Sequence, residues 1–267
     1  MKKIGIILSY SSSGGGIYQY AISILEALYI SKYKVKIIFF KDYWSNTLKD
    51  FSDKFELYPL TNKNVFIFSK LLLFLKTPVF AAQFLSKYIN PISKITESLD
   101  CDFWIFPYPD PLSYQLRLNS IVAIHDLMHI YEPRFPEASG FLRTPIRDYR
   151  FKSITKNAKL ILADSDIGKR HICDSYSVPK EKVKVLPFIP SKYISHENFK
   201  RKNYEELNFP KKFFFYPSKF WKHKNHINLL RAIKKVKEYH PDIHLVLTGD
   251  KKNEFRRIMK HIEMLNI

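Results

Sequence analysis

The chain has 267 residues, enough for one large domain or two of ordinary size. Because 46% of the residues are hydrophobic, the chain can bury a core, and this composition excludes an intrinsically disordered protein. Its two cysteines, Cys101 and Cys173, lie far apart and outside any metal-ligand spacing, which argues against a disulfide framework or a zinc site and favours a reducing compartment. The formal net charge is +19, which calls for an anionic partner.

The positive charge is densest in the last third of the chain. Residues 191–267 carry +10, from 18 Lys/Arg against 8 Asp/Glu, whereas the first 190 residues carry +9. Nucleic acid, an anionic membrane surface and a nucleotide diphosphate each attract such a charge. The charge alone does not choose among these three partners.

Short apolar runs alternate with helical patterns along the first 190 residues. In chain order, the expected elements are a strand at 3–10, a helix at 17–29, a strand at 35–40, helices at 65–75 and 79–99, strands at 103–106 and 121–125, a helix at 142–157, a strand at 160–163, a helix at 167–176 and a strand at 183–186. Strands that alternate with helices predict a parallel, doubly wound sheet.

A polar stretch without periodicity follows at residues 187–210, and it carries two prolines at its start. Beyond it we expect a strand at 213–216, a helix at 225–239, a strand at 243–247 and a helix at 253–265. Two strands and two helices cannot cover both faces of a parallel sheet. We therefore predict an α/β protein with two Rossmann-like domains, at residues 1–188 and 211–267, joined by a linker at 189–210, and we expect the second domain to be incomplete.

No segment predicts a membrane-spanning helix. The apolar run of the first ten residues is short and lacks a cleavage pattern, so we interpret it as a buried strand and not as a signal peptide. The most apolar region, residues 65–89, is interrupted by Lys70, Lys76, Pro78 and Lys87 and never reaches the roughly 18 uninterrupted apolar residues that a spanning helix needs. We predict a cytoplasmic protein, at most peripheral on the inner face of a membrane.

The segment 215–230, FYPSKFWKHKNHINLL, carries the strongest functional signal. A strand runs through a loop with Lys219, Lys222 and Lys224 into the start of a helix. Free backbone N–H groups and the positive end of a helix favour an anion there, and the lysines add full charges. The alternative is a solvated, lysine-rich loop without a ligand.

The segment 11–16, SSSGGG, joins the first strand to the first helix. Glycines let a backbone approach a ligand closely, and the following helix offers N–H groups to an anion. It is not the dinucleotide-binding fingerprint, because Gln19 stands where that pattern requires a glycine, and it is not a P-loop. The alternative is a tight connection with no ligand.

His125 and Asp126 lie at the carboxyl end of a predicted strand, where ligands of open α/β sheets bind. A neutral imidazole there can orient a sugar hydroxyl or exchange a proton near neutral pH. The alternative is a histidine that is merely hydrogen-bonded at the strand end.

Two proline-braced loops, residues 106–111 and 131–135, also leave strand ends and carry Asp110 and Tyr131. Their aromatic and charged side chains suit stacking on a sugar ring or binding an acceptor. Ordinary loop rigidity explains them nearly as well.

The segment 215–230 resembles the opening of the donor-binding domain in family 4 glycosyltransferases, which have the two-Rossmann-domain architecture called GT-B. In that family a basic residue, and a lysine five positions later, contact the diphosphate of the sugar nucleotide, and Lys219 and Lys224 match these positions. The resemblance extends from the first strand to Gly249. Gly15 and Gly16 match the family's glycine loop, which faces the cleft and the diphosphate, and His125 matches the histidine that lies near the reacting sugar.

The resemblance implies a retaining transfer of a hexose, mannose-like, from a UDP- or GDP-linked donor to a glycan or lipid-linked acceptor, as in the synthesis of bacterial surface polysaccharide or lipopolysaccharide. It implies no cofactor and no required metal. Lys219 and Lys224 would stabilise the charge that develops on the leaving diphosphate. Family members also carry a pair of glutamates after the segment that contains the two lysines. Glu197 and Glu205 have the spacing of that pair, but they precede the segment 215–230, so we do not assign them to it. We therefore expect a chain truncated in its donor-binding domain, with doubtful activity on its own.

A second hypothesis is a non-catalytic basic protein that binds an anionic membrane surface or nucleic acid. The chain contains no recognised nucleic-acid-binding module, which disfavours nucleic acid. Residues 66–88 mix aromatic side chains, leucines and lysines as interfacial helices do. The alternative for this segment is a pair of helices that cover the N-terminal sheet.

Overall fold

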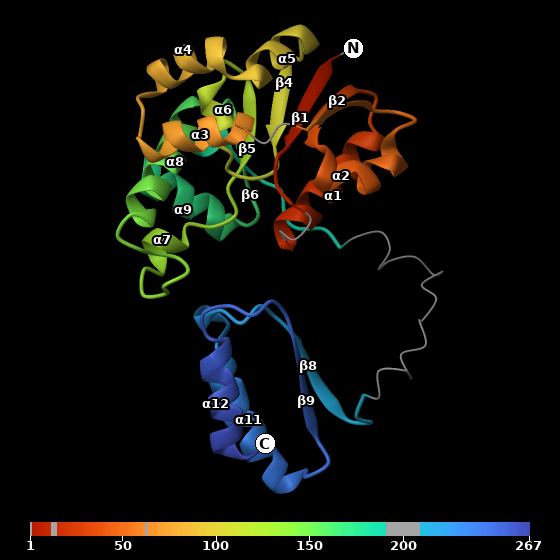
Figure 1. Cartoon of the computed structure of the whole chain (residues 1–267), viewed down its shortest axis with the longest axis vertical. Coiled ribbons are helices and arrows are strands. Elements are labelled where there is room, and N and C mark those ends of the chain that lie inside the picture. The colour runs from red at the N-terminus through yellow and green to blue at the C-terminus, as the bar shows by residue number, and fades with distance from the viewer. Residues whose placement is uncertain (1, 12–14, 62–63, 191–208) are drawn as a thin grey trace. The chain divides into compact units, whose positions relative to one another are not determined.

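A computed structural model describes residues 2–11, 15–61, 64–190 and 209–267 (Figure 1). The chain folds as two compact units: unit 1 contains Met1–Tyr131 and Phe141–Glu197, and unit 2 contains Glu132–Gly140 and Asn198–Ile267. Most of the predicted linker, 189–210, lies outside the described residues.

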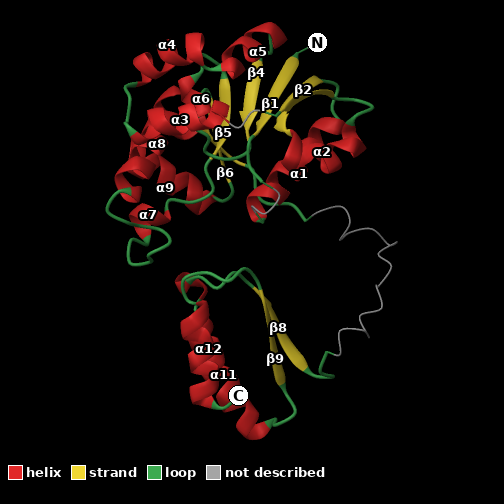
Figure 2. Ribbon diagram, in the orientation of Figure 1, coloured by secondary structure: helices red, strands yellow, loops and turns green. Residues whose placement is uncertain are grey.

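Unit 1 is built on a seven-stranded sheet in which all pairs of neighbouring strands are parallel (Figure 2). The strands are β1 (Lys3–Leu8), β2 (Lys34–Phe40), β3 (Glu56–Leu60), β4 (Phe103–Phe106), β5 (Ser120–Ala123), β6 (Leu160–Ala163) and β7 (Val183–Val185). Their order is β3-β2-β1-β4-β5-β6-β7, so the direction of winding reverses between β1 and β4. The predicted parallel α/β sheet is confirmed, and ligands of such sheets bind at this reversal.

The helices of unit 1 cover both faces of the sheet. They are α1 (Gly16–Tyr29), α2 (Lys41–Leu48), α3 (Asn64–Phe74), α4 (Val79–Ile89), α5 (Pro91–Leu99), α6 (Leu112–Gln115), α7 (Met128–Tyr131), α8 (Arg143–Asn157) and α9 (Asp166–Tyr176). Because side chains alternate along a strand, Ile6 and Leu8 of β1 pack with α1 and α2 on one face. Ile7 packs on the other face, in the cluster that holds residues of α3, α5, α8 and α9.

The β1–β4 contact leaves no room for a side chain at Gly5. Gly5 pairs directly with Trp104, and a Cβ atom at residue 5 would lie 2.4 Å from the indole ring. Trp104 is 1% exposed, so its ring fills this space inside the core. The glycine is thus required for packing.

The predicted helix at 79–99 is wrong in one respect, because it is two helices that break at Asn90. Asn90 is extended, and its side chain accepts a hydrogen bond from the backbone N–H of Ile92 at 3.0 Å. Pro91, at the first helical position of α5, disfavours helical geometry in the residue before it. A single cap therefore ends one helix and begins the next.

Four elements of unit 1 were not expected from the sequence: α2, β3, α6 and α7. Helix α2 is polar on average, and it is held by the burial of Trp44 and Leu48. Strand β3 contains Pro59, and it is an edge strand paired only with β2, where proline is tolerated.

Unit 2 contains the parallel pair β8 (Phe213–Pro217) and β9 (His244–Thr248), with α11 (His226–Tyr239) and α12 (Phe255–Leu265). All four elements were predicted, with bounds that differ by at most two residues. Phe220, Leu230 and Ile258 form its small buried core. Among the residues that the structure describes in either unit, none of the helices has the length and apolar character needed to cross a membrane.

Candidate functional site

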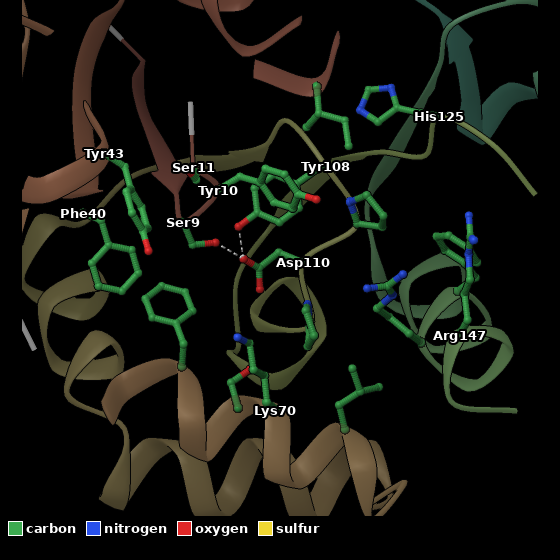
Figure 3. A pocket seen from close by; sticks show the side chains of 18 of the residues that line it. Ser9, Tyr10, Ser11, Phe40, Tyr43, Lys70, Tyr108, Asp110, His125 and Arg147 are labelled. Carbon is green, nitrogen blue, oxygen red and sulfur yellow. Dashed lines mark hydrogen bonds between the residues drawn. The ribbon is translucent and has the colours of Figure 1, made fainter. Parts of the chain in front are cut away.

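Unit 1 contains a pocket of about 670 Å³ at the carboxyl ends of its central strands (Figure 3). Its walls are residues 9–11 after β1, 108–111 after β4, and 125–126 after β5, together with side chains of α3 and α8. The pocket therefore lies at the reversal of strand order between β1 and β4. The structure brings together three of the predicted site residues there, namely Asp110, His125 and Asp126.

The carboxylate of Asp110 accepts three hydrogen bonds from protein groups. Ser9 Oγ donates at 2.5 Å and the Tyr108 hydroxyl at 2.6 Å (Figure 3). The backbone N–H of Leu112 donates at 2.8 Å. Asp110 is 2% exposed, and it connects the loops that follow β1 and β4. Burial, and then the charge and hydrogen bond of Asp110, raise the pKa of the Tyr108 hydroxyl well above its ordinary value, so Tyr108 stays a donor. Asp110 thus holds the wall of the pocket together.

The imidazole of His125 is held by its surroundings. Its Nε2 lies 2.9 Å from the carbonyl oxygen of Pro107, and its Nδ1 lies 3.7 Å from a carboxylate oxygen of Asp164. A carbonyl oxygen only accepts, so Nε2 carries the proton. The ring also meets the edge of Tyr20, with 4.8 Å between centroids. When the imidazole is neutral, Nδ1 is therefore the atom that can accept a hydrogen bond.

Two arginines of α8, Arg147 and Arg150, line the same pocket and were not predicted from the sequence. Arg147 Nη2 lies 2.5 Å from Asp126 Oδ1, which also accepts the backbone N–H of Met128. Arg150 lies over the ring of Phe151, at 5.1 Å, and burial followed by the nearby charge of Arg147 lowers its pKa. The guanidinium remains charged at neutral pH. Helix α8 has no local motif that marks these residues, because only the fold brings them to the strand ends.

The two predicted glycines lie at the start of α1. Gly15 has φ of 62° and is the N-cap residue, and, apart from its chain neighbours, no described residue has an atom within 4 Å of the Cβ that another residue would place there. Its backbone conformation therefore favours glycine, while its surroundings are open. A Cβ on Gly16 would make ordinary contact with the Phe188 ring at 3.6 Å. Residues 12–14 of the same loop lie outside the described residues.

Tyr131, at the end of α7, is not among the residues that line the pocket. Its ring stacks on His171 with 3.6 Å between centroids, and its hydroxyl lies 3.1 Å from Ser175 Oγ. Both partners belong to α9. The predicted acceptor contact of Tyr131 stays a prediction, and it concerns a surface outside this pocket.

The lysine loop of unit 2 runs from β8 to the start of α11. Lys219 Nζ lies 3.2 Å from Asp250 Oδ2, and the hydrogen bond and charge of Lys219 lower the pKa of that carboxyl. Lys224 is exposed and, within the described residues, its ammonium forms no ion pair. Asn225 has φ of 54°, and α11 begins at the next residue. The loop thus presents an unpaired ammonium next to a helix N-terminus.

Gly249 lets the chain after β9 approach this loop closely. It has φ of 150°, and a Cβ there would lie 2.3 Å from the carbonyl oxygen of Ser218. Asp250 follows directly and pairs with Lys219. The sequence signal for this arrangement is the Thr248-Gly249-Asp250 run, in which the role of Asp250 was missed.

Glu137 is a further residue that the sequence reasoning missed. It belongs to the segment Glu132–Gly140 of unit 2, and its carboxylate accepts hydrogen bonds from the backbone N–H of His223 at 2.8 Å and from His223 Nδ1 at 2.5 Å. Asn253 donates to its second oxygen at 3.3 Å. Glu137, His223 and Asn253 are distant from one another in sequence, so no local pattern predicts their contact.

No protein-family model and no curated protein matches this chain. In structure the chain is similar to HepE from Anabaena in complex with UDP-glucose (TM-score 0.63, 15% identity, 100% of this chain and 66% of that one). It is also similar to a glycosyltransferase from Rickettsia africae (TM-score 0.59, 17% identity, 99% and 65%) and to UDP-N-acetylglucosamine 2-epimerase from Rickettsia bellii (TM-score 0.52, 12% identity, 100% and 66%).

These similarities show the fold: the chain is an α/β protein whose structural neighbours have the GT-B architecture. The chain spans about two thirds of the length of those neighbours. One of them is an epimerase, so the fold alone does not define the reaction.

Proposed function

We propose that this chain binds a nucleotide diphosphate sugar and belongs to a glycosyltransferase. The observation that carries the proposal is the lysine loop of unit 2, which holds Lys219 and Lys224 between β8 and α11. The positive end of a helix and two ammonium groups suit a diphosphate. Neighbours of the same fold were solved with UDP and with UDP-glucose, which supports a nucleotide sugar as the ligand.

In this proposal Lys219 and Lys224 bind the two phosphates. When the bond between sugar and diphosphate breaks, negative charge develops on the leaving diphosphate, and a prearranged ammonium stabilises it. Asp250 holds Lys219 at 3.2 Å and so reduces the side-chain entropy that is lost on binding. Within unit 1, we assign the backbone N–H groups of Gly15 and Gly16, at the start of α1, to an anionic group of the ligand.

We assign His125 a place beside the sugar. With its Nε2 proton engaged by Pro107, the imidazole offers Nδ1 as an acceptor for a sugar hydroxyl. Asp126 and the wall that Asp110 holds together form the acceptor side of the same pocket. Retention of configuration, a mannose-like hexose, a glycan or lipid-linked acceptor and a role in surface polysaccharide synthesis complete the proposal, and these four points rest on the family resemblance.

Equilibrium titration of the full chain with UDP and with GDP tests the proposal. We expect binding of one nucleotide and a loss of about tenfold or more in the Lys219→Ala/Lys224→Ala variant, because each charge-assisted hydrogen bond to a phosphate contributes more than 1 kcal/mol. Lys234→Ala, an exposed lysine on α11, is the matched control and should bind as the unchanged chain does. Equal binding by the double variant would refute the proposal.

A second candidate function, contact with an anionic membrane surface, is favoured by one observation. Helices α3 and α4 carry large apolar side chains that are at least half exposed: Ile67, Leu71, Phe74, Phe80, Phe84, Tyr88 and Ile89. Lys70, Lys76 and Lys87 lie among them and are exposed. Apolar side chains with interspersed lysines are typical of surfaces that bind the membrane interface.

Flotation with lipid vesicles separates this candidate from general binding of polyanions. We expect the chain to float with vesicles that contain anionic lipid, and Phe80→Ser/Phe84→Ser to reduce the bound fraction. Binding that a soluble polyanion or nucleic acid abolishes, and that the serine variant retains, would instead indicate a basic surface without an apolar contribution.

A further inference from the structure

We propose that the pocket of unit 1 binds the anionic group of the acceptor, a phosphate or a carboxylate, through the guanidinium of Arg150, with Lys70 as a second cation. The identification of this ligand as the acceptor rests on the proposed function. The presence of an anion site rests only on the residues of the pocket.

The charges that face the pocket leave Arg150 without a carboxylate partner. Asp126 is paired with Arg147 at 2.5 Å. The carboxylate of Asp110 is occupied by three neutral donors, and its charge acts on Arg150 only from beyond ion-pair distance. Among the residues that the structure describes, neither Arg150 nor Lys70 forms an ion pair.

Arg150 also has a buried donor, its Nε–H group, without an acceptor among the described residues. The Nε atoms of Arg147 and Arg150 are both buried, and neither has a hydrogen-bond partner within the described ranges. A buried charge costs free energy unless an opposite charge or hydrogen bonds compensate it. A planar guanidinium binds a phosphate or carboxylate through two parallel hydrogen bonds, which is the compensation that this side chain lacks.

The remaining walls suit a sugar that carries such an anion. Tyr10 and Tyr108 pack together with 4.9 Å between ring centroids, and Phe40 packs on Phe66 at 4.6 Å. Both pairs line the pocket, and its volume of about 670 Å³ is in the range of small-molecule sites. Lys70 enters from α3, which also carries Ile67 on the pocket wall. Apolar, aromatic and cationic groups thus converge on one cavity.

Two kinds of acceptor share this chemistry: a lipid diphosphate and a sugar with a carboxylate. The test therefore uses geranyl diphosphate and methyl glucuronide as probes, with methyl glucoside as the neutral control. The full chain carries Lys219→Ala and Lys224→Ala in every titration, so that the lysine loop of unit 2 adds no anion binding. We expect one charged probe to bind and the neutral glycoside to bind more weakly.

Arg150→Gln should lower the affinity for the charged probe about tenfold or more, because the bidentate hydrogen bonds and the charge are both lost. Arg150→Lys keeps the positive charge but lacks the two parallel N–H donors of the guanidinium, so it should lower the affinity for the charged probe less than Arg150→Gln does. Arg143→Gln, an exposed arginine at the start of the same helix, is the control and should leave binding unchanged. Melting temperatures of all three variants identify any loss of folding.

A purely structural Arg150, which serves only to pack on Phe151, predicts a lower melting temperature in Arg150→Gln and no change in affinity. That result, or failure of both charged probes to bind the chain that retains Arg150, would overturn the inference. Titration of UDP into the chain with its native lysines decides the proposed function separately, because it reports on unit 2. Either conclusion can therefore fail while the other stands.

Discussion

The Nε2 atom of His125 lies 2.9 Å from the carbonyl oxygen of Pro107, and this contact fixes the neutral imidazole in the tautomer that is protonated at Nε2. The position of the proton decides what the residue can offer a sugar. An Nε2-protonated ring presents an acceptor at Nδ1 and has no donor left for a ligand.

The first prediction concerns the tautomer itself. Two-bond ¹H–¹⁵N spectra at a pH where His125 is neutral should show a protonated Nε2 and an unprotonated Nδ1. Glu97→Gln, on the exposed face of α5, should leave the pattern unchanged. A proton on Nδ1 would show that the carbonyl of Pro107 does not direct this ring.

The second prediction concerns Asp110. Asp110→Ala leaves the buried hydroxyl of Tyr108 and the N–H of Leu112 without an acceptor, and we expect a loss of about 2–4 kcal/mol in the free energy of unfolding. Ser9→Ala removes one donor from the same carboxylate and should cost about 1 kcal/mol. Urea unfolding measures both values. Equal effects of the two substitutions would show that Asp110 does not hold the pocket wall.

The third prediction is a pH dependence caused by His129. Burial, and next the charge of Arg147, lower the pKa of His129 from 6.5 to about 4. The other groups that act on it are Arg150, which also lowers its pKa, and Asp126 and Asp148, which raise it. Its hydrogen-bond partner is the Tyr176 hydroxyl, at 3.3 Å.

The unfolded chain therefore binds a proton at this histidine more readily than the folded chain does. The contribution of His129 to stability is complete above pH 6.5 and is lost as the pH falls toward 4. His129→Gln should show a smaller fall of melting temperature across that interval. An equal fall in both chains would exclude His129 as the cause.

The fourth prediction compares two glycines. Gly249→Ala forces a Cβ to within 2.3 Å of the Ser218 carbonyl oxygen at a φ of 150°, so we expect a destabilisation of about 1–3 kcal/mol in unit 2. Faster hydrogen exchange of the β8 and β9 amides measures it. Gly16→Ala makes only ordinary contact with Phe188 and should leave these amides unchanged. Unchanged exchange in Gly249→Ala would mean that the lysine loop can move aside.

Sequence patterns were sufficient for the elements whose apolar residues are consecutive or regularly spaced. Strand β1, helix α1 and the β8–α11 connection were predicted because burial on one or both faces requires apolar residues at regular spacing in the sequence. Helix α2 lacks this regular spacing, because it is polar on average and only Trp44 and Leu48 are buried. Long-range packing, not local preference, decided such elements.

The site was predictable only where its residues follow strand ends. Asp110, His125 and Asp126 lie in the loops that follow β4 and β5, and the structure places them in one pocket. Arg147 and Arg150 reach the pocket from the middle of α8. In the sequence, charged residues within a helix usually indicate its solvent-exposed side and not a binding site. Tyr131 also follows a strand in the sequence, but a short helix turns it toward α9.

The missing side chain at Gly5 has a consequence for how this protein can vary. The indole of Trp104 occupies the space that any larger residue at position 5 would need. A relative that gains a methyl group at position 5 must therefore shrink the side chain at position 104 in compensation, and the two positions should change together across descendants of this gene. A larger residue at position 5 or a smaller residue at position 104, introduced alone, should be poorly tolerated. The two substitutions together should restore the packing between β1 and β4.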